Sequence, residues 1–110
     1  MTDQEFHQKA DEALASLDRA LSKAADEHGF EIDSHAGALT LEFEDPHARF
    51  VVSPNSPVKQ VWVSALNKSF KLDFDATQNT FVLRETGQTL TDLITSVVGQ
   101  QLGEEIDLEG

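Results

Sequence analysis

Ligand-type side chains follow one another at helical spacing near the start of the chain. Asp3, His7 and Asp11 stand at positions i, i+4 and i+8. Asp18 and Ser22 continue along the same flank of the predicted helix. Carboxylate oxygens are ligands for hard cations such as Mg²⁺ and Ca²⁺, and Fe²⁺ also accepts an imidazole. This flank therefore predicts a line of metal ligands, and the alternative is a solvent-exposed helix side with local contacts only.

Four more carboxylates lie on two consecutive segments in which apolar and polar residues alternate. Neighbouring residues of a strand face opposite sides, so these acidic side chains point away from the apolar ones. They are Glu31, Asp33, Glu42 and Glu44. Together with the helix flank they predict an acidic ridge. Because such a ridge has no loop that wraps an ion and its ligands stay solvated, we expect weak, multiple and poorly selective cation binding.

Several kinds of site are excluded by the residues that the chain lacks. It has no Cys, which excludes disulfides, thiolate metal sites and Cys nucleophiles. It also lacks a P-loop and the G-x-G-x-x-G, G-x-S-x-G and H-E-x-x-H motifs. Its four His residues do not have the spacing of a closed zinc site. We therefore expect a protein that is not an enzyme and has no catalytic residues.

Trp62, the only Trp of the chain, is a second candidate for function. It lies in an alternating segment, and if Val61 and Val63 face the core, Trp62 faces out. A Trp on an uncovered sheet face is typical of binding hot spots. The alternative is that neighbouring side chains such as Val58 shield the indole in a small satellite of the core.

The charge of the chain is strongly negative and unevenly distributed. The net charge is −12, from 20 acidic and 8 basic residues. Residues 1–45 hold twelve acidic and three basic residues, whereas residues 46–84 hold two acidic and five basic ones. An acidic field repels phosphate backbones and anionic lipids, so we expect no nucleic-acid or membrane partner. Without a signal-like N-terminus or a long apolar stretch, the sequence indicates a soluble, cytoplasmic protein.

Two segments have the apolar periodicity of amphipathic helices, and six segments between them alternate as strands do. The predicted helices cover residues 3–27 and 90–102, each opened by a capping box, at Thr2 with Glu5 and at Thr89 with Asp92. The predicted strands cover residues 30–33, 39–44, 48–53, 58–65, 70–74 and 80–84.

Short links between consecutive strands favour antiparallel pairing, and two helices with one apolar face each cover one side of a sheet. The sequence therefore predicts one α+β domain over residues 1–110. Its expected architecture is a two-layer α/β sandwich of a helix, about six antiparallel strands and a helix, with both helices on one face.

Five fragments of the chain, in order, carry a resemblance to a known family. They are Glu5-Phe6-His7-x-x-Ala10-Asp11, Gly37-Ala38-Leu39-Thr40-Leu41-x-Phe43, Pro57-x-x-Gln60-Val61-Trp62-Val63-Ser64, Phe70-x-Leu72-Asp73 and Thr86-Gly87-Gln88-Thr89-Leu90-x-Asp92-Leu93. With these fragments the whole chain resembles the frataxin family, specifically bacterial frataxins of the CyaY type. The Pro-x-x-Gln-Val-Trp strand is the most specific of the five.

The resemblance implies a non-enzymatic protein of iron–sulfur cluster assembly that binds iron weakly through its acidic ridge and modulates a cysteine desulfurase. It implies that Asp26 and Glu27, at the end of the first helix, add to the iron ligands. It also implies partner contacts with the desulfurase and the scaffold machinery. The residues expected in those contacts are Asp11, Asp18, Asn55, Gln60 and Trp62. We expect a monomer in the absence of iron.

Two other functions remain open at the level of the sequence. The first is a purely regulatory protein whose acidic face binds a basic partner, with metal binding as a consequence of charge. The second is a ferroxidase or iron store, because clustered carboxylates can nucleate ferric mineral. The second is less favoured, because the chain has no Glu-x-x-His helical pair of the di-iron type.

Overall fold

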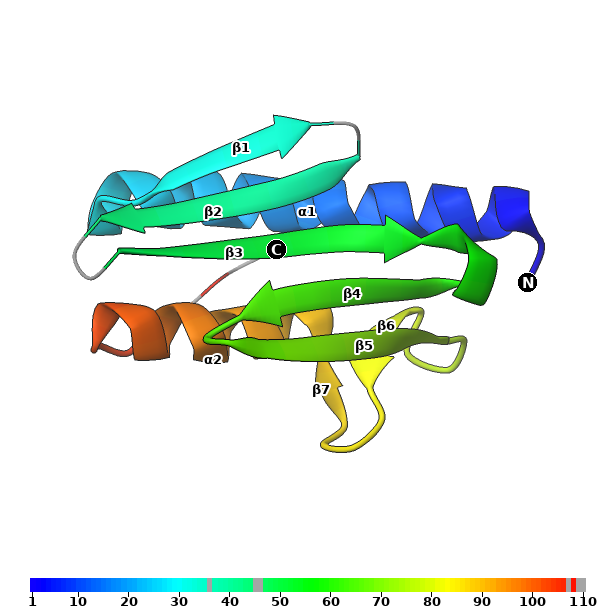
Figure 1. Ribbon diagram of the computed structural model, residues 1–110. Helices are drawn as coiled ribbons and strands as arrows, with labels where there is room; N and C mark the ends of the chain where they lie inside the picture. The colour runs from blue at the N-terminus through cyan, green and yellow to red at the C-terminus, as the bar shows by residue number, and fades with distance from the viewer. Residues whose placement is uncertain (36, 45–46, 107, 109–110) are drawn as a thin grey trace.

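The computed structural model describes residues 1–35, 37–44, 47–106 and 108, and shows helices packed on one face of a sheet (Figure 1). Along the chain the elements are α1 (Asp3–His28), β1 (Glu31–His35), β2 (Ala38–Glu44), β3 (His47–Asn55), the 3₁₀ helix η1 (Ser56–Val58), β4 (Gln60–Ala65), β5 (Lys68–Asp75), β6 (Thr80–Leu83), β7 (Gln88–Thr89) and α2 (Leu90–Leu102). The predicted turn at residues 45–47 and the predicted link at residues 35–38 fall partly outside the described residues.

Both helices begin at the predicted capping boxes. In α1 the Thr2 hydroxyl accepts a hydrogen bond from the Glu5 backbone N–H at 3.1 Å, and in α2 Thr89 and Asp92 make the same arrangement. Helix α1 ends at Gly29, which adopts a left-handed conformation with φ of 78° and donates its N–H to Ala25. Only Gly adopts that conformation at little cost, so the chain turns there toward β1.

The sheet has seven antiparallel strands within the described residues, arranged in chain order from β1 to β7. The predicted α+β sandwich with both helices on one face is confirmed (Figure 1). The sequence analysis predicted about six strands, because β7 is only two residues long and precedes α2 directly. A two-residue strand has no alternation that a sequence pattern can reveal.

The predicted boundaries of β3 and β4 differ from the structure. Strand β3 continues through Pro54 to Asn55, where the sequence indicated a break. Proline is tolerated because β2 pairs with β3 only as far as Val52, so β3 beyond it has a strand on one side only. Strand β4 begins at Gln60 rather than residue 58, because Lys59 adopts a left-handed conformation with φ of 53° that ends η1.

The hydrophobic core lies between the helices and the sheet. Helix α1 contributes Phe6 and Leu21, helix α2 contributes Ile94, and the sheet contributes residues such as Leu41 and Val61, all of them fully buried. After α2 the chain returns to the core, where Leu108 is buried and Ile106 is partly buried. No helix in the described part of the chain is both long and apolar enough to cross a membrane.

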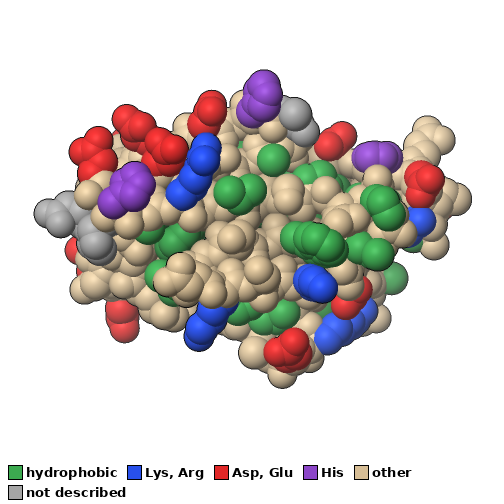
Figure 2. Space-filling view, viewed as in Figure 1, with side chains coloured by type: hydrophobic (Ala, Val, Ile, Leu, Met, Phe, Trp, Pro, Cys, Tyr) green, Lys and Arg blue, Asp and Glu red, His purple; other side chains and the backbone are tan. Residues whose placement is uncertain are grey.

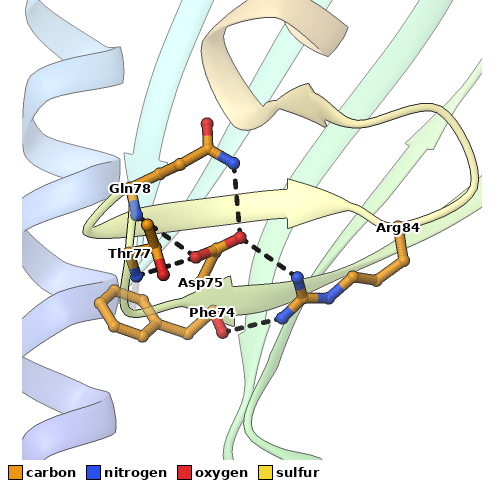
Figure 3. Close-up of polar contacts among 5 residues, drawn as sticks. All are labelled: Phe74, Asp75, Thr77, Gln78 and Arg84. Carbon is orange, nitrogen blue, oxygen red and sulfur yellow. Dashed lines mark hydrogen bonds and ion pairs between the residues drawn. The ribbon is translucent and has the colours of Figure 1, made fainter.

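The hairpin between β5 and β6 is closed by a polar network around Asp75 (Figure 3). The Asp75 carboxylate accepts hydrogen bonds from the backbone N–H groups of Thr77 and Gln78, at 2.8 and 3.2 Å. Arg84 reaches back from the end of β6 and donates to Asp75 at 3.2 Å and to the Phe74 carbonyl at 3.3 Å. These contacts hold the turn in place and connect the two ends of the hairpin.

Candidate functional site

The register of β1 and β2 brings two carboxylates directly opposite each other. Glu31 pairs with Glu42, and both side chains are exposed on the face of the sheet that the helices leave uncovered. On β3, Arg49 stands opposite Glu42, with its Nε 3.6 Å from Glu42 Oε1. Like charges across a strand pair repel each other, and a single arginine compensates only part of that repulsion. This end of the sheet therefore attracts cations.

A hollow of about 570 Å³ joins the end of α1 to this acidic end of the sheet. Figure 2 shows acidic side chains gathered over the same ends of β1 and β2, next to one basic side chain. The hollow is lined by Ser22, Ala25, Asp26, Phe30, Glu31, Ile32, Asp33, Thr40, Glu42 and Arg49. Four predicted metal ligands thus line one hollow without converging on a common point, and we call Asp26, Glu31, Asp33 and Glu42 the acidic hollow.

The other predicted ligands lie outside the acidic hollow. Six of them are distributed along α1 and at the end of β2: Asp3, His7, Asp11, Asp18, Glu27 and Glu44. A helix rises about 1.5 Å per residue, so Asp3 and Asp26 stand roughly 34 Å apart along α1. The ten predicted ligands therefore form a long acidic surface. Among the described residues, no three Asp, Glu or His side chains converge in a group that could hold a metal ion.

Two of the predicted carboxylate ligands on α1 already have a partner within the chain. Asp3 Oδ1 lies 2.9 Å from Lys59 Nζ, and the hydrogen bond and charge of Lys59 hold the pKa of Asp3 below its ordinary value of 3.8. Asp18 accepts a hydrogen bond from the Ser22 hydroxyl at 3.2 Å. A cation that binds at Asp3 must therefore compete with Lys59, whereas Arg49 is the only basic residue among the described ones that line the acidic hollow.

Trp62 lies on the uncovered face, as the alternation of β4 predicted, and its side chain is 37% exposed. Its Nε1 donates to Gln60 Oε1 at 2.9 Å, and Gln60 Nε2 donates to Asp73 Oδ1 at 3.0 Å. Asn55 pairs with Gln60 across β3 and β4, so the three predicted partner-binding residues of the sheet are neighbours.

Lys71 belongs to the same surface and was missed by the sequence analysis. Its ammonium lies 5.1 Å from the centre of the Trp62 ring, at cation–π distance, because β5 places it directly opposite Trp62. The missing information was the register, which a two-residue turn sets through Leu66 and Asn67, both with positive φ. Asn in a short link between alternating segments is the signal that could have indicated this hairpin.

Comparison with known proteins agrees with the fold and with the fragments noted in the sequence. A family model described as a frataxin-like domain matches residues 1–104. An iron-sulfur cluster assembly protein CyaY from Pseudomonas fluorescens (strain Pf0-1) is 28% identical over 110 residues, covering 100% of this chain and 97% of the relative. One from Azotobacter vinelandii is 23% identical over 107 residues, covering 97% and 94%.

The solved structure of a frataxin from Psychromonas ingrahamii, of the CyaY family, is similar over the full length of both chains. It has a TM-score of 0.78 and 25% sequence identity, and covers 100% of each chain. The sequence relatives, the structural neighbour and the family model all cover nearly the whole chain. The chain therefore belongs to the frataxin-like family.

Proposed function

We propose that this chain acts in iron–sulfur cluster assembly, where it binds ferrous iron weakly and modulates a cysteine desulfurase. The names of its relatives support the process, since those proteins are called iron-sulfur cluster assembly proteins. The observation that carries the iron part is the acidic hollow, where four carboxylates from α1, β1 and β2 share one space. Carboxylate oxygen is a hard ligand that Fe²⁺ accepts, and an exchangeable cargo requires weak binding.

The acidic surface also supports the proposed partner contact. A desulfurase with a basic groove would meet α1 and the β1–β2 end together, because both are acidic and adjacent. The patch of Asn55, Gln60 and Trp62, farther along the same uncovered face, would then add an aromatic contact. In this proposal iron and the partner compete for the same carboxylates, and the protein works without an active site of its own, in the cytoplasm and as a monomer when iron is absent.

A second candidate is a purely regulatory protein whose acidic face serves the partner only. One specific observation favours it: the described residues contain no group of three ligands that could hold a metal ion. In that case iron binding would be a consequence of charge, and the effect on the desulfurase would not depend on iron.

The test is the rate of cluster assembly by a cysteine desulfurase and scaffold of the same organism, over a range of Fe²⁺ concentrations. The variant is Glu31→Lys with Glu42→Lys, and the matched control is Glu85→Lys with Glu105→Lys, two exposed acidic residues outside the acidic hollow. We expect an iron-dependent change of rate that the first variant abolishes and the control retains. A change that is independent of iron would favour the regulator, and no change with the wild-type protein would contradict both proposals.

A further inference from the structure

The outer edge of β5 is open along its first half. Strand β5 pairs with β4 from Lys68 to Asp73, but with β6 only from Asp73 to Asp75. Within the described residues, the backbone from Lys68 to Leu72 therefore has no strand on its outer side, as Figure 1 shows beside the β4–β5 turn. An open edge presents N–H and C=O groups that can pair with an added extended chain.

The space beside this edge has two chemically different sides. It is a hollow of about 510 Å³ lined by Lys68, Ser69, Phe70, Lys71, Leu83 and Glu85. Phe70 is half-buried on the helix side of the sheet and Leu83 is buried next to it, whereas Lys71 is exposed on the uncovered side. Because side chains of a strand alternate, an added strand would direct every second residue toward Phe70 and Leu83 and the others toward Lys71.

The local charge at this edge is positive, in contrast to the rest of the molecule. Lys68 and Lys71 are both exposed there, and Glu85 is the only acidic residue that lines the hollow among those described. Two carboxylates of β5 lie nearby but do not line the hollow: Asp75 is paired with Arg84, and Asp73 accepts a hydrogen bond from Gln60. Strand β1 lies four strands away, roughly 19 Å at the usual strand spacing, which is about two Debye lengths at physiological salt.

We propose that the open edge of β5 is a docking site for an extended segment of another protein in which acidic and apolar residues alternate. The backbone of the segment pairs with residues 68–72, its apolar side chains contact Phe70 and Leu83, and its carboxylates face Lys71 and Lys68. This site is separate from the acidic hollow and takes a partner of the opposite charge.

The probe is an acetylated and amidated peptide of seven residues in which Val and Glu alternate, measured by NMR hydrogen exchange and chemical-shift titration of the full chain. We expect slower amide exchange confined to residues 68–72 and no binding of the same peptide N-methylated at every residue, which leaves neither edge of the peptide with a backbone donor. Lys68→Glu should weaken binding about fivefold, and Lys23→Glu, an exposed residue on α1 with the same change of charge, should leave it unchanged.

Three outcomes would overturn the proposal. The first is equal binding of the N-methylated peptide, which would show a charge contact without strand pairing. The second is the absence of amide protection at residues 68–72, which would show that the peptide does not bind at this edge. The third is a concentration-dependent dimer, seen by sedimentation, that Lys68→Glu abolishes and Lys23→Glu retains, because the occupant would then be a second copy of the chain. Failure of both peptides to bind belongs to the second outcome, and Lys68 and Lys71 would then serve only to keep the edge from aggregating.

Discussion

Asp75 lies outside the acidic surface and accepts more hydrogen bonds than the other described carboxylates there (Figure 3). Its titration therefore affects the stability of the fold. The backbone hydrogen bond from Gln78 is the largest cause that lowers the pKa of Asp75 below its ordinary value of 3.8, against the opposing effect of burial. Further hydrogen bonds from the Gln78 side chain and Thr77, and the charge of Arg84, act in the same direction.

A carboxyl group whose pKa is lower in the folded state stabilises the fold at pH values above its ordinary pKa. This stabilisation is lost as the pH falls through the pKa of the folded state. We therefore expect Asp75→Asn to have a lower Tm than the wild type at neutral pH, and the difference to narrow as the pH falls below 3.8. Thermal unfolding followed by circular dichroism at several pH values measures it, with Glu105→Gln as the control. A difference that stays constant down to strongly acidic pH would contradict this assignment.

Trp62 allows stability and function to be separated at a single residue. Its indole is partly exposed and contacts Gln60 and Lys71, so Trp62→Ala should lower the free energy of unfolding by only roughly 1 kcal/mol. The same substitution should strongly reduce the effect of the protein on the desulfurase, because an exposed aromatic anchor contributes to binding. Val58→Ala is the control, since Val58 is also exposed and is not one of the predicted partner-binding residues. A large loss of stability without loss of the desulfurase effect would mean that Trp62 is a packing residue.

At the scale of the elements, the pairing of β1 with β2 carries a destabilising arrangement. Glu31 and Glu42 are directly opposed, and like charges in that position destabilise a strand pair. We expect Glu31→Gln to raise the free energy of unfolding by roughly 0.5 kcal/mol while it weakens cation binding. Urea unfolding at low ionic strength measures the first effect, with Glu12→Gln on α1 as the control. An unchanged or lower stability would show that the repulsion is already relieved by Arg49.

The elements differ in how much of them the sequence could predict. The helices were predicted to within one residue at each end, because caps such as Thr2 with Glu5 and Gly29 act through neighbouring residues. The start of β4 was wrong by two residues, because Lys59 takes a positive φ that its residue type does not favour. Helix caps can be predicted from a sequence because they depend on neighbouring residues. A backbone conformation that the surrounding structure imposes cannot.

The candidate site was predicted as residues and not as an arrangement. Alternation was enough to place Glu31, Glu42 and Trp62 on the same, uncovered face of the sheet. The opposition of those two carboxylates and the position of Arg49 depend on strand register, which the predicted segments left undetermined. The length of α1 was predicted, and it already implies that Asp3 lies far from the acidic hollow. The predicted set of ligands nevertheless included residues from both ends of the helix.

For the whole molecule, the uneven charge determines the response to cations. Residues 1–45 hold twelve acidic residues against three basic ones, and the structure gathers many of them along α1, β1 and β2. A divalent cation that binds the folded state should therefore raise the Tm, and more so than NaCl at the same ionic strength. Differential scanning fluorimetry with Mg²⁺ or Ca²⁺ measures this. A Tm that falls with either ion would contradict a clustered acidic surface.

We expect iron to bind at the acidic hollow, and an anaerobic NMR titration with Fe²⁺ would locate the bound ion residue by residue. Paramagnetic iron broadens the signals of nearby nuclei, so the backbone amides of Asp26, Glu31, Asp33 and Glu42 should lose intensity first, and Glu31→Lys with Glu42→Lys should prevent the loss. The amides of Asp92 and Lys68, outside the hollow, should remain sharp at the same iron concentration. Uniform broadening over the whole chain, or no broadening at the acidic hollow, would contradict iron binding at the acidic hollow.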